Sequence, residues 1–418
     1  MVTLPPLPDE KFEHRPEYGE YVTAKHARGE PIHNWFVYPH SFAPQLVRAL
    51  LDEYPPPREG LIYDPFVGAG TTLLGCKELG ISAVGTDLLP LSVFVSNVKV
   101  RDYHVSTLRR HLSQLHFEDE PRSENHFATV PIIEKAFNAQ IIKQISIVYE
   151  AIQEIRNPKY RGFFLLGLLS ILEDVSNGAK WGGWLRLLPA KKVNVSAVIP
   201  LFEERIRKMI EQLAERPGCE TNGASWKATM GDARSVRLPS KVDFVISSPP
   251  YLNKHDYTRV FALELTLAFV KNADELKALR YQSLRSHVEA RCPEAEPLDY
   301  VSPPLLKQCI ESLQAGELYS DRLIPMIEGY FKDIHSTLVN LQDHLNPGGR
   351  IALVLGNVRY GGVMIPVDQI VAELGEQIGL ALEKVIVARY RGNSAQQMDR
   401  FGKQPSREGI IVWRNPAT

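Results

Sequence analysis

Residues 61–90, LIYDPFVGAGTTLLGCKELGISAVGTDLLP, constrain the fold of this chain more than any other segment. An apolar, β-favouring run ends at Asp64 and is followed by a glycine-containing turn. A helix is predicted from near Thr71 to Gly80, where glycine permits a left-handed helix stop, and the next apolar run ends at Asp87. The order strand, helix, strand indicates a parallel pair of strands, because parallel neighbours need a crossover connection of this kind.

The alternation of strands and helices returns after residue 222. About seven strands can be counted in the whole chain by their apolar, β-branched composition. The fold class is therefore α/β, with a doubly wound, mainly parallel sheet. Beyond the first two, strands are predicted in 225–235, 241–251, 349–358, 382–390 and 409–415, and a helix in 366–379. The last two strands could be antiparallel neighbours, because their link, residues 391–408, has little helical pattern.

Outside this sheet core the pattern changes. Residues 1–30 are expected to form an extended N-terminal arm. Helical periodicity dominates residues 103–222, which indicates a helical insertion between the second and third strands. A second insertion of loop and helix, charged and rich in proline, is expected at 272–322. The sheet core is then formed by residues 31–102 and 223–418.

Composition excludes several classes of protein. The net charge is −1 at pH 7, so the chain has no general attraction to polyanions, and any basic surface must be local. The four cysteines are scattered without metal-ligand spacing, which favours a reduced cytoplasmic protein without a metal site. The polar N-terminus does not resemble a signal peptide, and the apolar run 162–172 is too short to cross a bilayer. A membrane partner is therefore not expected.

The glycine-containing turn of 61–90 has the chemistry of a ligand site. Gly68 and Gly70 would let the backbone approach a ligand closely, and the amides of the helix that begins at Thr71 would face a polar or anionic group. No lysine follows the glycines, so this is not the phosphate loop of an ATP- or GTP-binding protein. The alternative is a tight turn between strand and helix that binds no ligand.

Two acidic residues are expected near this turn. Asp87 ends the second strand, and Asp232 ends the third. Open α/β sheets bind ligands at the carboxyl ends of their strands, where an acidic residue accepts hydrogen bonds from ribose hydroxyls. Taken singly, each aspartate could instead be a solvated strand end or a helix cap.

The segment DFVISSPPY, residues 243–251, ends a further strand on a stiff turn. Pro249 and Pro250 remove two backbone donors, and Ser248, which precedes a proline, is driven towards an extended conformation. The turn would present carbonyl oxygens, a hydroxyl and the ring of Tyr251 to a flat hydrogen-bond donor, such as the exocyclic amine of a nucleobase. The alternative is an ordinary Pro-Pro turn after a core strand.

These motifs together resemble those of the amino-methyltransferases, which methylate exocyclic amines of cytosine (N4) or adenine (N6) with S-adenosylmethionine. DPFVGAGTT is close to the family's cofactor motif, and SSPPY is close to its catalytic motif. The resemblance covers 30–100 and 225–415 and implies a seven-stranded, Rossmann-like methyltransferase sheet, with 31–102 and 223–418 as the catalytic domain.

The resemblance also implies a role for each matching residue. Asp87 would bind the ribose hydroxyls of the cofactor, and Asp232 would contact its adenine amine. Ser248 and the Pro249 carbonyl would accept hydrogen bonds from the target amine, with Pro250 in the same catalytic motif, and Tyr251 would stack on the base. The aromatic segment 35–44 resembles the one that completes the cofactor pocket. The full set of implied cofactor-binding residues is Asp64, Phe66, Gly68, Gly70, Thr71, Thr72, Asp87, Asp232 and Ala233.

The first residue of the catalytic motif favours cytosine. In the family, Ser-Pro-Pro-Tyr usually accompanies N4 of cytosine, whereas Asp or Asn in the first position usually accompanies N6 of adenine. A serine hydroxyl can donate as well as accept, which suits the unprotonated N3 of cytosine, whereas a carboxylate would repel it. The target base would have to leave the duplex, or start unpaired, to reach the pocket.

The expected partner is DNA, and a cognate restriction endonuclease is a possible second partner. The same chemistry on adenine or on ribosomal or transfer RNA is an alternative, and a non-catalytic, nucleic-acid-binding methyltransferase fold is another. The oligomeric state is not predicted. The cofactor motif here precedes the catalytic motif, whereas many relatives with DPF..G.GTT have the reverse order, so the target-recognition region could be 103–222 or 272–322.

Two polar segments are candidates for contact with nucleic acid. Tryptophans with nearby cations could stack on bases and hold phosphates, and amides could bind near the pocket. Buried tryptophans and ordinary solvated loops are the alternatives. The candidate residues are Lys180, Trp181, Trp184, Arg186, Arg391, Asn393 and Gln396.

Overall fold

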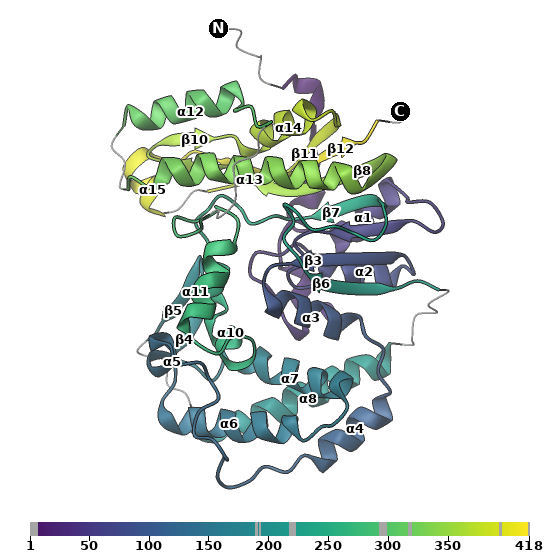
Figure 1. The fold of residues 1–418 in the computed structure, drawn as a ribbon, viewed down its shortest axis with the longest axis vertical. Helices are drawn as coiled ribbons and strands as arrows, with labels where there is room; N and C mark the ends of the chain where they lie inside the picture. Colours follow the sequence, from purple (N-terminus) through teal and green to yellow (C-terminus); the bar gives the residue numbers. More distant parts are fainter. Residues whose placement is uncertain are drawn as a thin grey trace.

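A computed structural model describes residues 7–188, 191, 194–216, 223–291, 299–316, 320–392 and 395–416. At its centre is an eight-stranded sheet with the order β1-β11-β12-β8-β7-β2-β3-β6 (Figure 1). The fold is the predicted doubly wound α/β type. The strands are β1 (Phe12–His14), β2 (Leu61–Asp64), β3 (Ser82–Asp87), β6 (Trp226–Met230), β7 (Val242–Ser247), β8 (Leu345–Gly356), β11 (Ala381–Arg391) and β12 (Ser406–Arg414).

The strands of the sheet core run as the alternating pattern requires. β2 pairs in parallel with β3 on one side and with β7 on the other. β3 in turn pairs in parallel with β6, and β7 pairs in parallel with β8. β12 is antiparallel to both β8 and β11, so the expected antiparallel arrangement of the last two strands is confirmed. The chain leaves β2 towards β3 in one direction and later enters β7 on its other side. The sheet therefore changes its winding direction between β2 and β7.

The N-terminal region differs from the expected extended arm. Residues 12–14 form β1, which adds an eighth strand parallel to β11, with Phe12 opposite Val385. The segment then follows short 3-10 turns, and Arg15 N donates to Val387 O at 3.0 Å. Tyr18 and Val22 are buried in the core, so the apolar residues of this region give it a packed structure.

Alternate residues of each central strand face opposite layers of helices. Ile62 belongs to the core beneath α1 (Pro44–Glu53), α2 (Thr71–Glu78) and α3 (Pro90–Val100). Its neighbour Tyr63 belongs to the core beneath α12 (Pro304–Gln314), α13 (Leu323–His344) and α14 (Val367–Gln377). This period of two is the signature of a strand that is covered on both faces.

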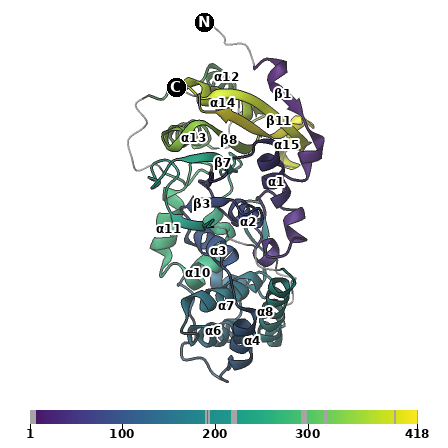
Figure 2. The same ribbon diagram turned by 90° about the vertical axis from the view of Figure 1, so that its right-hand side faces the viewer.

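Residues 105–215 form a separate block of helices at the end of the molecule opposite α12, α13 and α14 (Figure 2). Phe163 of α7 packs edge-on against Trp35, with ring centroids 5.2 Å apart, so the block is attached beside the first part of the chain. A short hairpin, β4 (Gly178–Trp181) and β5 (Trp184–Leu187), interrupts the helices. The helices are α4 (Val105–Gln114), α5 (Pro131–Ala136), α6 (Ala139–Gln153), α7 (Pro158–Ile171) and α8 (Val198–Glu215).

Shorter elements complete the described structure. They are α9 (Tyr257–Val260), α10 (Ala262–Ala268), α11 (Ala273–Gln282), α15 (Ala395–Phe401), and a second hairpin, β9 (Val358–Tyr360) with β10 (Val363–Ile365). The helix α15 lies in the link where the sequence predicted little helix. Within the described ranges, no helix combines the length and the apolar character needed to span a membrane.

Candidate active site

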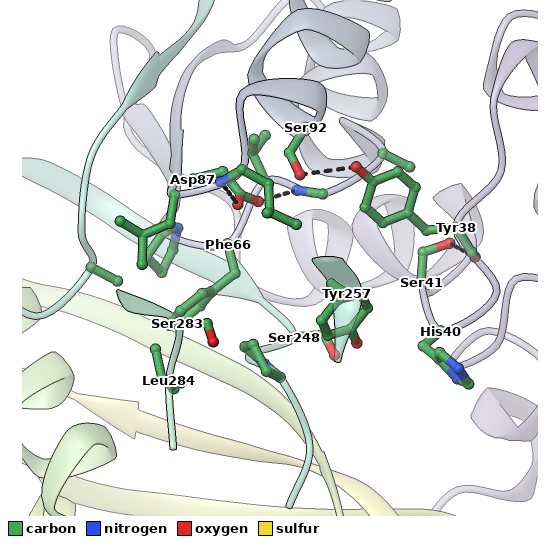
Figure 3. Close-up of a pocket in the computed structure, with 18 of the residues that line it drawn as sticks. Tyr38, His40, Ser41, Phe66, Asp87, Ser92, Ser248, Tyr257, Ser283 and Leu284 are labelled. Atoms are coloured by element: carbon green, nitrogen blue, oxygen red, sulfur yellow. Dashed lines mark hydrogen bonds between the residues drawn. The ribbon is translucent and has the colours of Figure 1, made fainter. Parts of the chain in front are cut away.

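The two motif turns meet at the change of winding direction. The turn 65–70 follows β2, and the turn that begins at Ser248 follows the adjacent strand β7. Because parallel strands end at the same edge of a sheet, both turns open onto one pocket, as in other doubly wound sheets. Figure 3 shows Ser248 and Tyr257 in the middle of this pocket, with Asp87, Phe66 and Ser283 on one side and Tyr38, Ser41 and His40 on the other.

The glycines of the first turn are required by backbone geometry. Gly68 and Gly70 have φ of +47° and +79°, a region that disfavours residues with a Cβ. A Cβ on Gly70 would also lie 2.9 Å from Cα of Ser96, so α3 approaches the turn too closely for any side chain. Gly68 lines the pocket, whereas Gly70 lies between the turn and α3.

Asp64 connects the two motif turns. Its carboxylate accepts hydrogen bonds from Thr72 Oγ1 at 2.7 Å, from Ser247 Oγ at 2.6 Å and from Phe66 N at 3.1 Å. Burial raises the pKa of Asp64 to about 6, while these hydrogen bonds oppose the rise. Asp64, Phe66 and Thr71 line the pocket, but the fully buried Thr72 supports Asp64 from behind. One carboxylate thus fixes the glycine turn relative to the residue before Ser248.

Asp87 is placed at the pocket wall, as the sequence predicted. Its Oδ2 accepts from Gly68 N at 3.0 Å and its Oδ1 from Leu89 N at 2.9 Å (Figure 3). Each carboxylate oxygen has a further lone pair, so the group can also accept hydrogen bonds from a diol in the pocket. Burial raises the pKa of Asp87 to about 6.

The structure gives Asp232 a partner within the chain. Its carboxylate is held by Arg234 in a two-point ion pair, with Nε–Oδ1 and Nη2–Oδ2 distances of 2.9 and 2.7 Å. Among the described residues, its neighbours Gly231 and Ala233 line the pocket and Asp232 does not. The arginine two positions later binds both carboxylate oxygens, but each oxygen keeps a further lone pair, so a contact between Asp232 and the adenine amine stays a prediction.

Two residues of the Ser-Pro-Pro-Tyr turn line the pocket, and the other two do not. Ser248 and Pro250 line the pocket, while Pro249 and Tyr251 lie outside the lining set among the described residues. Tyr251 lies against Arg391, whose Cζ is 5.7 Å from the ring centroid, and near Gly356 of β8. Burial raises the pKa of Tyr251, and its hydroxyl interacts with Ser248 and with Glu408 of β12.

An aromatic residue that the sequence analysis missed faces the pocket instead. Tyr257 lines the pocket beside Ser248, and its ring stacks on Phe261 with an interplanar angle of 13° (Figure 3). It is the first residue of α9, whose N-cap Asp256 accepts from Thr258 N at 2.9 Å. An aspartate cap just after the catalytic motif was the available signal for this helix.

The aromatic segment 35–44 forms one wall of the pocket, as its resemblance implied. Tyr38, His40 and Ser41 line the pocket, and the Tyr38 hydroxyl is 2.9 Å from Ser92 Oγ (Figure 3). Lys99, only 2% exposed, ties this segment to the glycine turn.

Among the described residues, Lys99 donates hydrogen bonds to backbone carbonyls only. Nζ donates to the carbonyls of His33, Phe36 and Ala69 at 2.9, 2.7 and 2.9 Å. Ala69 stands between the two glycines of the turn, so this side chain joins the aromatic wall to the backbone of the cofactor turn. Burial lowers the pKa of Lys99 to about 7.

The opposite wall comes from a segment without a recognised motif. Residues 283–287 were part of the second candidate for target recognition, yet their side chains line this pocket. The segment is held by Arg285, whose backbone N and Nη2 donate to Asp333 of α13, each at 2.8 Å. The pocket-lining members are Ser283, Leu284, Ser286 and His287, with Leu279 of α11.

The predicted nucleic-acid contacts are only partly accessible. Lys180 is a correction, because its ammonium forms a largely buried ion pair with Glu264 and is not available to a phosphate. Trp184 is 58% exposed on the hairpin β4–β5, and Arg186 is exposed on the same strand. Arg391 packs over Tyr251. Asn393 lies outside the described residues, as do the side chains of Trp181 and Gln396.

No protein-family model matches the chain. It is similar to three relatives named Type II methyltransferases, which confirms the resemblance carried by the motifs. M.BsoBI of Geobacillus stearothermophilus is 29% identical and aligns with 93% of this chain and 86% of its own length. M.AvaI of Nostoc sp. is 28% identical over 93% of this chain and 87% of that relative. M.MvaI of Kocuria varians is 22% identical over 82% of this chain and 81% of its own length.

Solved structures give a weaker likeness. The rRNA methyltransferase aviRa from Streptomyces viridochromogenes aligns at 12% identity and a TM-score of 0.31, over 90% of this chain and 86% of that chain. The assignment of the fold rests on the strand order and pairing described above.

Proposed function

We propose that this chain, a relative of the Type II methyltransferases along 93% of its length, methylates the exocyclic amine of a base in DNA, and that the base is cytosine, at N4. One observation carries the proposal. The glycine turn after β2 and the Ser-Pro-Pro-Tyr turn after β7 open onto the same pocket and share Asp64 as a common anchor.

The pocket fits S-adenosylmethionine, which would supply an electrophilic methyl group. Gly68, which has no side chain, leaves a backbone surface in the pocket for the methionine part, and Asp87 offers acceptor capacity for the ribose hydroxyls. Apolar side chains and one hydroxyl would enclose the adenine. We assign this enclosure to Phe66, Leu88, Leu89, Ala233, Ser283 and Leu284.

The target amine would bind at Ser248, which lines the pocket. This hydroxyl and the Pro249 carbonyl would accept the two N–H groups, which orients the nitrogen lone pair towards the methyl group. The serine hydroxyl can also donate to N3 of cytosine, which an aspartate in this position could not do. The nitrogen forms a bond to the methyl carbon as the sulfur–carbon bond breaks. The nitrogen then loses one proton to solvent, on the side where Ser248 lies.

Tyr257 is the ring best placed to stack on the target base, because it lines the pocket beside Ser248. Tyr251 would support the turn from behind through its contacts with Arg391 and Gly356.

Domain roles follow from this arrangement. Residues 31–102 and 223–418 would form the catalytic domain, and the helical insertion 103–222 with its hairpin would contact the DNA. The naming of the relatives also supports a cognate restriction endonuclease as a functional partner.

The test is transfer of a labelled methyl group from S-adenosylmethionine to native DNA, denatured DNA and unmodified RNA, followed by mass spectrometry of the nucleosides. N4-methyldeoxycytidine is the expected product. N6-methyldeoxyadenosine would contradict the cytosine assignment, and a methylated ribonucleoside would contradict the DNA assignment. Cofactor binding without any product would favour a non-catalytic, nucleic-acid-binding protein.

A further inference from the structure

The hairpin β4–β5 touches the rim of the pocket. The carbonyl oxygen of Gly182 in its turn lies 3.4 Å from Nε2 of His40, and Asp256 N donates to the carbonyl oxygen of Gly183 at 3.2 Å. A Cβ on Gly183 would lie 2.8 Å from Cδ2 of His255, so the turn lies directly against this residue. His40 and His255 both line the pocket, and the hairpin turn is therefore fixed at its edge.

The hairpin has one buried and one exposed face. Lys180 and Leu185 are opposite each other in the strand pairing, and both point into the protein. The Lys180 ammonium binds Glu264 and lies 5.2 and 5.1 Å from the ring centroids of Phe36 and Phe261. Because side chains alternate along a strand, Trp184 must point to the other face, and its side chain is 58% exposed there.

An exposed tryptophan on a fixed hairpin indicates a partner with a flat apolar surface. Tryptophan has a large ring system that is normally covered, and here the backbone that carries it is held by contacts on both sides of the turn. Consecutive Cα atoms are about 3.8 Å apart, so Trp184 begins one residue from the glycine that touches His255. Trp184 therefore lies one residue from a turn that contacts two residues of the pocket wall, His40 and His255.

We propose that Trp184 is a wedge that inserts into duplex DNA and stacks on the base pair next to the extruded target base. The inference rests on the proposed function, because only an enzyme that takes a base from a duplex needs such a residue. Extrusion of a base removes its stacking, and an aromatic side chain that takes the vacated place compensates part of this loss. Trp184 would act on the duplex rather than on the cofactor or on the reacting atoms.

The experiment first maps the methylated site of the wild-type protein in genomic DNA. Oligonucleotide duplexes are then made in which the target base is either paired or mispaired. Initial methylation rates are measured for wild-type protein, Trp184→Ala, Trp184→Phe and the control Leu79→Ala. Leu79 is also a large exposed apolar residue, at 45%, but it follows the end of α2 that is distant from the pocket. Cofactor affinity is measured for every variant by calorimetry.

We expect Trp184→Ala to methylate the paired target at least about tenfold more slowly than the wild type, which is the loss expected when one stacking contact is removed. The mispaired target needs less help to leave the duplex, so its rate should fall by less than about threefold. Trp184→Phe should keep most of the rate, and cofactor affinity should stay unchanged in both variants. Leu79→Ala should match the wild type on both duplexes.

Four results would overturn the inference. Equal rates of Trp184→Ala and wild type on the paired duplex would show that Trp184 does not act as a wedge. An equal fall on paired and mispaired duplexes, or a loss of cofactor affinity, would show that Trp184 supports the pocket itself. A smaller assembly of Trp184→Ala in sedimentation would show that a second copy of the chain covers the ring. A wild-type protein that methylates no DNA would instead refute the proposed function.

Discussion

Replacement of Lys99 by methionine tests how the aromatic wall and the cofactor turn are joined. Methionine keeps most of the side-chain volume but removes the amine that donates to the carbonyls of His33, Phe36 and Ala69. Each buried carbonyl that loses its donor costs roughly 1 kcal/mol or more. A neutral amine has two N–H groups, so above pH 7 the free energy of unfolding should fall by about 2 kcal/mol. Because the Ala69 carbonyl belongs to the glycine turn, affinity for S-adenosylmethionine should also fall by about tenfold.

The pH dependence of this effect follows from the pKa of Lys99, which burial lowers to about 7. An unfolded lysine has a pKa of about 10.4, so between these two values the unfolded chain binds a proton that the folded protein does not. Wild-type stability should therefore rise with pH in this window relative to Lys99→Met. Between pH 7.5 and 9 the difference in unfolding free energy should grow by about 2 kcal/mol.

The assay is urea unfolding at several pH values, together with calorimetric titration of the cofactor. Lys77→Met is the matched control, because Lys77 is also a buried lysine with a carbonyl acceptor, Val100 O at 2.7 Å, but it lies at the far end of α2. This control should lose stability and keep its cofactor affinity. An unchanged cofactor affinity in Lys99→Met would show that Lys99 has no influence on the turn. A stability difference that does not vary with pH would show that the buried amine keeps its ordinary pKa.

Other substitutions test the assigned roles separately. Gly70→Ala should lower cofactor affinity by at least about tenfold, because its Cβ would strike Ser96 at 2.9 Å and the φ of +79° disfavours alanine; calorimetry that finds wild-type affinity would contradict this. Ser248→Ala should lower the methylation rate by at least about a hundredfold with cofactor affinity unchanged, since its hydroxyl is assigned to the target amine; a rate near the wild-type value would refute that assignment. Tyr257→Ala should lower activity by at least about tenfold, whereas Tyr257→Phe, which keeps the ring in the pocket, should retain most of it; a steady-state rate of Tyr257→Ala near the wild-type value would return the base-stacking role to Tyr251.

The parts of the site that could be predicted from the sequence are those with local signals. The glycine turn and the Ser-Pro-Pro-Tyr turn each follow an apolar strand, and the ends of parallel strands must meet at one edge of the sheet. Asp87 was placed correctly for the same reason. Asp232 also ends a strand, but Arg234 takes its carboxylate, and position along the chain alone does not show which of two partners an aspartate binds.

The residues that could not be predicted reach the pocket through tertiary packing. Ser283 and Leu284 follow no recognisable motif, and their position depends on the hydrogen bonds between Arg285 and Asp333, 48 positions apart. The hairpin β4–β5 did carry a local signal, since two glycines separate Trp181 from Trp184 within alternating residues. That alternation also explains why Lys180 and its cross-strand partner Leu185 point into the protein while Trp184, the neighbour of Leu185 along the strand, is exposed.

The pairing of β1 with β11 has a consequence for how the protein is made. Phe12 lies opposite Val385, and Lys11 Nζ donates to the Leu382 carbonyl at 2.8 Å across a separation of 371 residues. During synthesis the first of these segments must wait, without its partner, until nearly the whole chain has left the ribosome. The sheet is therefore closed at this edge only in the finished protein, and a nascent chain that already contains both motif turns still has an unpaired β1.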